Sequence, residues 1–191
     1  MSKLVTVVAP IAVSLTLPFA TAAFELEDGT FIFDDETPVP AVVMAIQDCG
    51  ADENTFATRD PFAGGFLFAI QCPGNNENSM QALVFAKTED GAGAYALRFY
   101  GPDHIRDDFA DIISNKRLYP DKNEIGEIFV DRETDERADP NVCRTEGRWR
   151  LEGQPLKPKL VYWRQTADCE GNTGWKVLLD DGGGPVLESK D

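Results

Sequence analysis

Four cysteines constrain the fold of this 191-residue chain more than any other feature of its sequence. They are Cys49, Cys72, Cys143 and Cys169, and the gap within the first two is similar in length to the gap within the last two. An even number of cysteines in an exported chain indicates disulfides, and four cysteines allow three pairings. Each gap encloses a plausible strand-turn-strand unit, so we predict that neighbours pair. A zinc site is the alternative, but the chain has no Cys-x-x-Cys pair and one histidine.

The first residues predict export. Lys3 is followed by an apolar stretch over residues 4–17 and then by small residues up to Ala23, which is the three-part pattern of a secretory signal peptide. We expect cleavage of residues 1–22, which leaves 23–191 as one β-rich domain in the periplasm or secreted. A membrane anchor would need about 20 apolar residues, more than this stretch or any later one contains, so we expect no transmembrane anchor after cleavage.

The negative charge of the chain lies in its first two thirds. The formal net charge is −15, with 25 acidic and 9 basic residues over 24–140 and 8 of each over 141–191. Phosphate binding needs a basic surface, so this balance argues against nucleic acid and anionic lipid as partners. The acidity serves solubility, or it fits a basic exported partner such as a cell-wall hydrolase that this protein would inhibit.

The hydrophobic pattern predicts an all-β fold, either a mostly antiparallel sandwich or an open barrel. Runs rich in β-branched and aromatic residues indicate strands at 30–33, 41–47, 65–71, 81–86, 95–100, 127–130, 147–151, 160–165 and 175–179. Glu89-Asp90-Gly91 predicts a hairpin turn, and Asp60-Pro61 predicts another turn.

Two segments interrupt the strand pattern. Apolar residues at helical spacing over 105–113 predict one short helix. The charged run 131–137 has no apolar period, so we expect an exposed loop there and a possible seam between two fused halves near 131–140. A calcium loop is the alternative for the segment that begins at Asp121, but Arg132 stands where an EF-hand needs glutamate.

No cluster of residues predicts catalysis, and we expect no catalytic residue, cofactor or metal. His104 is the single histidine and lies among acidic neighbours, which favours a surface position. No serine stands in a nucleophile elbow, and the thiols are expected to be oxidised. A carboxylate pair could support glycoside hydrolysis, but 33 acidic residues offer no basis for selecting two.

A short arginine-rich segment is the candidate ligand face. If 147–151 is a strand, Arg148 and Arg150 project to one side while Trp149 and Leu151 project to the other. Together with Arg164, these arginines could hold a carboxylate or sulfate. The alternative is that Trp149 and Leu151 fill the core and the arginines pair with local acids.

The last third of the chain carries a resemblance to a known family. The pattern from Cys143 to Leu151, followed by Tyr162-Trp163-Arg164 and by Asp168-Cys169-Glu170-Gly171 with Trp175 beyond, resembles the C-terminal part of a secreted proteobacterial family, domain-of-unknown-function family 1176. In this resemblance Cys49 and Cys72 match an earlier cysteine pair. It implies export and a disulfide-bearing β fold, and it supplies no catalytic residues.

The sequence therefore predicts an exported, non-enzymatic binding or interaction domain. A carboxylate-based hydrolase and an acidic inhibitor of a basic cell-wall hydrolase are the alternatives. The ligand and the partner are not specified by any motif.

Overall fold

Two antiparallel sheets form the protein, as the all-β prediction required. The computed structural model describes residues 24–52, 55–73, 78–102, 110–130 and 142–181. The predicted signal peptide, the predicted seam near 131–140 and most of the predicted helix lie outside these residues. No helix in the described ranges is long and apolar enough to cross a membrane.

The first sheet has seven strands in the order β1-β2-β3-β4-β5-β6, and β7 also pairs with β5. The strands are β1 (Phe24–Glu25), β2 (Phe31–Ile32), β3 (Ala57–Phe62), β4 (Gly65–Gln71), β5 (Met80–Ala86), β6 (Tyr95–Ala96) and β7 (Ile112–Ser114). The turn predicted at 89–91 joins β5 and β6, which pair antiparallel.

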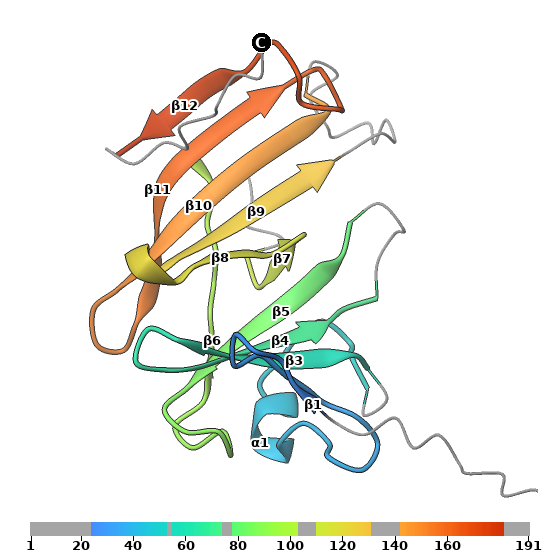
Figure 1. Cartoon of the computed structure of the whole chain (residues 1–191). Coiled ribbons are helices and arrows are strands. Elements are labelled where there is room, and N and C mark those ends of the chain that lie inside the picture. The colour runs from blue at the N-terminus through green and yellow to red at the C-terminus, as the bar shows by residue number, and fades with distance from the viewer. Residues whose placement is uncertain (1–23, 53–54, 74–77, 103–109, 131–141, 182–191) are drawn as a thin grey trace, which may run out of the picture.

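The second sheet has five strands in the order β12-β11-β10-β9-β8 (Figure 1). They are β8 (Arg117–Tyr119), β9 (Glu124–Val130), β10 (Arg144–Glu152), β11 (Lys157–Thr166) and β12 (Lys176–Asp180). A short 3-10 turn, η3 (Pro120–Lys122), links β8 to β9, and Asn123 after it adopts a left-handed conformation with φ 53°.

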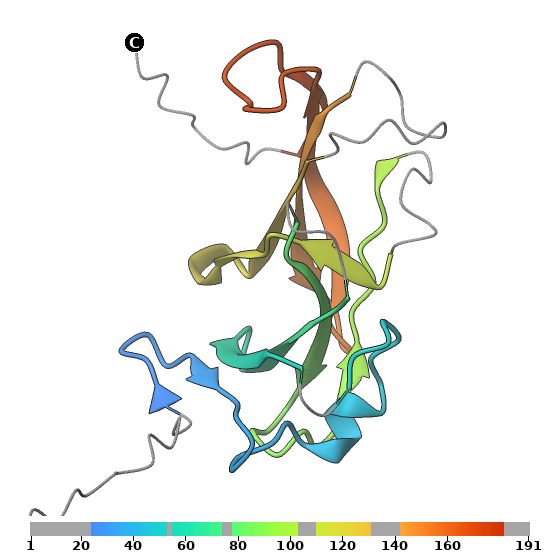
Figure 2. The same ribbon diagram turned by 90° about the vertical axis from the view of Figure 1, so that its right-hand side faces the viewer.

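The main hydrophobic core lies where the two sheets meet. Trp149 and Trp163 from the second sheet pack against Leu67, Phe85 and other buried residues of the first. The two indole rings meet edge to face with centroids 6.0 Å apart, an arrangement that aromatic pairs favour. Figure 2 shows both sheets from the side, stacked along the length of the molecule.

A second, smaller core covers the other face of the first sheet and corrects one prediction. Residues 41–47 were expected to form a strand, but α1 (Ala41–Met44) is a short helix. Pro40 presets its own φ at the helix start, and its carbonyl accepts the backbone N–H of Val43. Val43 is then fully buried with Phe68 and Ile70, so tertiary packing overrides the strand preference of the valines.

Two further predictions are corrected. The end of the expected helix over 105–113 is instead β7, because Ile112 and Ile113 pair with Ala82 and Gln81 of β5. The turn expected at Asp60-Pro61 lies within β3. Proline is tolerated there because β2 pairs with β3 only through its earlier residues Thr58 and Arg59, which leaves no ladder partner for a missing N–H.

The chain passes from the first sheet to the second at Asn115 and Lys116. Asn115 has φ 47°, and its side-chain amide donates to Asn78 Oδ1 and to the carbonyl of Ile128 on β9. Lys116 Nζ lies 2.6 Å from a carboxylate oxygen of Asp60, and both side chains are largely buried. These contacts bind the connecting residues Asn115 and Lys116 to both sheets.

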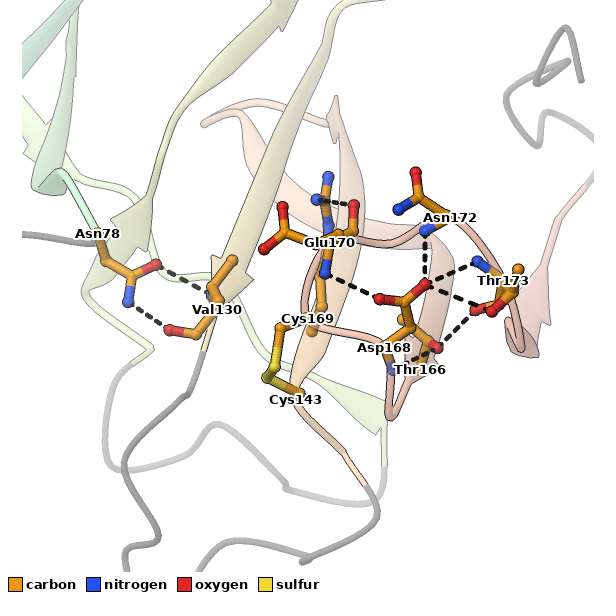
Figure 3. Close-up of a disulfide and its surroundings, with 10 residues drawn as sticks. Asn78, Val130, Cys143, Thr166, Asp168, Cys169, Glu170, Asn172 and Thr173 are labelled. Carbon is orange, nitrogen blue, oxygen red and sulfur yellow. Dashed lines mark hydrogen bonds between the residues drawn. A yellow bond between two sulfur atoms is a disulfide. The ribbon is translucent and has the colours of Figure 1, made fainter. Parts of the chain in front are cut away.

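Both predicted disulfides are confirmed. Cys49 pairs with Cys72, with Cα atoms 5.5 Å apart, and this bond closes the segment that contains β3 and β4. Cys143 pairs with Cys169, with Cα atoms 4.9 Å apart. The second bond joins the start of β10 to the end of its antiparallel neighbour β11 (Figure 3).

Candidate functional site

The candidate site is the face of the second sheet that points away from the main core. Along β10 the residues alternate, so Trp149 and Leu151 enter the core while Arg148 and Arg150 lie on the opposite face. Arg164 on β11 shares this outer face, because it is directly opposite Glu146 in the ladder. The structure therefore brings the three sequence-predicted arginines to one face.

Aromatic rings and guanidinium groups alternate across this face. The Arg164 guanidinium carbon lies 3.8 Å from the ring centroid of Trp175 and 6.0 Å from that of Tyr162. On the far side, the Arg148 guanidinium carbon lies 5.2 Å from the Tyr162 ring and 5.6 Å from the Tyr119 ring. The order is therefore Trp175, Arg164, Tyr162, Arg148, Tyr119, a stack of cation–π contacts.

Two glutamates place negative charge within the stack. Glu146 accepts hydrogen bonds at Oε2 from Nε and Nη2 of Arg164, and at Oε1 from Arg144. Glu124, whose side chain is fully buried, accepts at Oε1 from Nε and Nη2 of Arg150, at 3.2 and 2.8 Å. A carboxylate this far from water is stable only with such partners.

Arg148 differs from the other two arginines in one respect. Arg150 and Arg164 each direct the Nε–Nη2 edge of the guanidinium at a carboxylate oxygen. On Arg148, which is 5% exposed, Nε and Nη2 have no hydrogen-bond partner among the residues that the structure describes. Its Nη1 lies 3.5 Å from Oε2 of Glu124, and that oxygen also lacks a hydrogen bond. The edge of Arg148 that suits bidentate carboxylate binding is thus unfilled.

A glycine makes room for this arrangement. Gly126 on β9 lies beside Arg148 in the ladder, and a Cβ added there would approach Cε2 of Tyr119 to 2.9 Å. Real Cβ atoms essentially never come that close, so only glycine lets the Tyr119 ring lean over the strand toward Arg148. The local sequence of β9 thus positions one side of the stack.

The loop between β11 and β12 positions Trp175, which lies at the opposite end of the cation–π stack from Tyr119. The Asp168 carboxylate accepts hydrogen bonds from the backbone N–H groups of Glu170, Asn172 and Thr173 (Figure 3). The indole N–H of Trp175 donates to the carbonyl of Gly171, which holds the ring over Arg164. The Cys143–Cys169 disulfide anchors the same loop.

The pKa values of three groups on or beside this face depart from their ordinary range. Burial raises the pKa of Tyr162, and the nearby Arg164 charge opposes that shift. The hydrogen bond to Glu124 raises the pKa of Arg150. For Asp168, partial desolvation raises the pKa but the backbone hydrogen bonds outweigh it, so that the pKa is lowered.

Hollows elsewhere on the described surface are small or shallow. A cleft of about 200 Å³ lies between the segment after α1 and the edge of the first sheet, and Gln47, Arg98 and Asp111 line it. A more open hollow of about 410 Å³ surrounds the β3–β4 turn near Phe62 and Lys87. In the described ranges no three His, Cys, Asp or Glu side chains are grouped to hold a metal ion.

Sequence reasoning identified the three arginines and, as its alternative, their pairing with local acids, which the structure shows for Arg150 with Glu124 and for Arg164 with Glu146. It did not identify which residues are the partners. The sequence analysis did not assign Tyr119, Glu124, Tyr162 or Trp175 to the arginine face, although all four contact it. A signal for Tyr162 and Arg164 was present, because residues two apart in a strand share a face. Glu124 reaches the site only through the pairing of β9 with β10, and Tyr119 only through the pairing of β8 with β9, and no local pattern reveals either pairing.

Comparison of the chain with family models, with curated proteins and with solved structures returned no match. The resemblance of the last third to domain-of-unknown-function family 1176 stays a prediction.

Proposed function

We propose that the protein is an exported binding domain that holds an anionic group, a carboxylate or a sulfate, against Arg148 on the outer face of the second sheet. The two disulfides are consistent with a protein that works outside the cytoplasm, and we propose the periplasm as its location. No catalytic step is assigned to this site.

The unfilled edge of Arg148 carries the proposal. Leaving a buried donor without a partner costs about 1–3 kcal/mol, and Arg148 has two such donors. An anion that accepted both would recover that free energy and would add a charge-assisted, bidentate contact. The equivalent edges of Arg150 and Arg164 show the same geometry already filled by protein carboxylates.

The net positive charge of this face also favours an anionic ligand. Arg117, Arg144, Arg148, Arg150 and Arg164 lie on it with Lys157 and Lys159, against Glu124, Glu146, Glu152 and Asp180. This local excess of positive charge lies on a chain whose formal net charge is −15. A small acidic ligand would be attracted to it, whereas a long polyanion would also meet the acidic remainder of the protein.

Ligand entry requires a movement of Tyr119. Nε and Nη2 of Arg148 are covered, so an anion can reach them only if a flanking ring turns aside. Tyr119 is half-buried at the end of the short strand β8, whereas Tyr162 is buried in the middle of β11. Moving the Tyr119 ring therefore costs less free energy than moving the Tyr162 ring.

Side-chain NMR on the wild-type protein tests the proposal directly. Sodium acetate and sodium sulfate would be titrated at constant ionic strength while the Arg Nε–H resonances are followed. We expect a saturable shift of the Arg148 resonance with both anions, and none of comparable size for Arg117, which is exposed on the same face. A linear, unsaturable response of all arginines alike would contradict an anion site.

Variants separate a binding role from a folding role. Arg148→Lys keeps the charge and removes the fork, so we expect a folded protein with anion affinity lowered about tenfold or more. Arg117→Met is the control: it removes one exposed charge of the face but no group of Arg148, so it should lower the anion affinity far less than Arg148→Lys does. If Arg148→Lys bound acetate and sulfate as well as the wild type does, Arg148 would not be the binding group.

The alternative functions gain less support. A glycosidase needs a carboxyl group with a raised pKa, whereas the three described carboxyl groups whose pKa departs from the ordinary range, Asp28, Asp90 and Asp168, are all lowered by local hydrogen bonds. The buried Glu124 and the partly buried Glu146 are both paired with arginines. The predicted basic partner of the acidic half stays a prediction.

A further inference from the structure

We infer that β12 is a docking edge through which two copies of this chain pair, joining their second sheets into one continuous antiparallel sheet. This edge adjoins Tyr162 and Arg164 of the arginine face, because Asp180 and Val177 are their ladder partners, but the inference does not depend on anion binding at Arg148.

The free edge of β12 is the first observation. β12 is the terminal strand of the second sheet, and in the described part of the chain only β11 pairs with it. An edge strand offers unpaired backbone N–H and C=O groups to a further strand. In Figure 1 β12 lies at the end of the molecule opposite α1, away from the first sheet.

The side chains of β12 are unusually apolar for an edge. Val177 is 52% exposed and Leu178 is 40% exposed, and they follow one another in the strand. Pairing with a second strand would bury both side chains against their counterparts and remove apolar surface from water. The other edge, β8, has three residues and begins with the exposed Arg117, so it offers a shorter and more charged surface.

The strand is complementary to itself, which selects a second copy as the occupant. Lys176 stands at one end of β12, and Asp180 and Asp181 stand at the other. Antiparallel pairing centred on Leu178 brings Lys176 of each copy beside Asp180 of the other, and pairing centred between Leu178 and Leu179 brings it beside Asp181. Opposite charges directly across a ladder stabilise pairing, and a two-fold axis forms each contact twice.

The distribution of charge favours this end of the molecule. The acidic surplus lies in residues 24–140, whereas residues 141–191 contain 8 acidic and 8 basic residues. Two copies that met through their first sheets would repel one another, but contact through β12 brings the balanced parts together. Asp181 forms an exposed ion pair with Lys159 at 3.5 Å. Because an exposed ion pair contributes little free energy, Asp181 could leave Lys159 and pair with Lys176 of the second copy at small cost.

The dimer is expected to be weak. The register between β11 and β12 shifts by one residue beside Leu178, which adds twist and shortens the stretch available for pairing. With so small a contact area, a dissociation constant on the order of 100 µM is appropriate. Raising the salt concentration should weaken the dimer further, since its specific contacts are exposed ion pairs.

Sedimentation velocity of the full mature chain, from about 10 µM to about 1 mM, tests the proposal. We expect the wild type to shift from monomer to dimer over this range. Lys176→Glu places like charges together and should weaken the dimer about tenfold. Combining Lys176→Glu with Asp180→Lys and Asp181→Lys restores complementarity and should return the dissociation constant to within about threefold of the wild type.

A matched pair of apolar substitutions checks the location. Leu178→Asp should abolish the dimer, whereas Leu26→Asp, at a residue 41% exposed beside β1, should leave it unchanged. Thermal unfolding would confirm that each variant is folded. A wild type that stays monomeric at about 1 mM overturns the proposal. A dimer that persists unchanged in both Lys176→Glu and Leu178→Asp does so as well, and would show that another surface pairs.

Discussion

Asn78 and Val130 exchange two hydrogen bonds between the two sheets: Asn78 Nδ2 donates to the Val130 carbonyl at 2.7 Å, and the Val130 N–H donates to Asn78 Oδ1 at 3.0 Å (Figure 3). The amide side chain thus imitates one rung of an antiparallel ladder. It gives the last residue of β9 a partner that no strand supplies from that side.

Replacing this amide should destabilise the protein measurably. Asn78→Ala leaves two backbone groups of Val130 without partners, so we expect the free energy of unfolding to fall by about 2 kcal/mol. Urea denaturation followed by tryptophan fluorescence measures the change. Asn172→Ala, at an exposed loop residue, is the control and should change stability by less than about 0.5 kcal/mol. Equal effects of the two substitutions would show that the bridge contributes nothing specific.

Removing the charge of Glu124 should cost more. Glu124→Gln keeps the shape of the side chain but leaves Arg148 buried without a counter-ion, and we expect a loss of about 3–5 kcal/mol. Glu152→Gln breaks only exposed pairs with Arg150 and Lys159, so it should cost less than about 1 kcal/mol. A Glu124→Gln protein as stable as the wild type would mean that Arg148 finds compensation elsewhere.

A methyl group at Gly126 should disturb the stack through Tyr119. Because the added Cβ would lie 2.9 Å from the ring, we expect Gly126→Ala to destabilise the protein, by about 1–3 kcal/mol. Replacing the Tyr119 ring by a leucine side chain should relieve the clash. Gly126→Ala should therefore lower the free energy of unfolding by less in a Tyr119→Leu background than in the wild type. A double-mutant cycle measures this coupling, and strict additivity of the two substitutions would argue against contact between them.

The two disulfides should contribute similarly to stability. They span 23 and 26 residues, and loops of that length are worth roughly 3 kcal/mol each in the chain-entropy model. Replacing either pair by alanine should therefore lower the denaturation midpoint by a comparable amount. Only the loss of Cys143–Cys169 should also release Trp175 from Arg164, which the near-ultraviolet circular dichroism of tryptophan would report.

Stability should decline at acid pH partly through Asp168. Its folded pKa lies below the ordinary value, so its contribution is present above the unfolded pKa and is lost as the pH falls through the folded pKa. Asp168→Asn should therefore be less stable than the wild type at neutral pH, and the difference should shrink below about pH 4. Thermal midpoints between about pH 2 and pH 7 test this, and a constant difference across that range would exclude the linkage.

The parts of the fold that rest on short-range patterns were predictable from the sequence. Alternation in β10 separates Trp149 from Arg148, and similar spacing of the cysteines indicated the correct pairs. The strand predicted at 41–47 was wrong. β-Branched valines favour strands locally, but Pro40 and the apolar surface of the first sheet select a helical turn at Ala41–Met44.

The partners of the arginines could not be predicted for a different physical reason. Glu124 meets Arg150 across 26 positions of sequence, and the chain offers 33 acidic residues as candidates. The choice among them is made by the register between β9 and β10, which in turn depends on Gly126 and on how Trp149 fits the core. Strand register is a property of the assembled sheet, so no single segment encodes it.

The order of strands in the second sheet follows the order of the chain, and this has a kinetic consequence. Each strand after β8 pairs with the strand that precedes it, so its ladders join near neighbours in the chain and cost little chain entropy, and the longest connection is the one over 131–143 between β9 and β10. In the first sheet β7 alone reaches back past β6, to β5. We expect the second sheet to form quickly, because its strands pair in chain order. The pairing of β7 with β5, which brings Asn115 and Lys116 to their partners, should then limit the rate of folding.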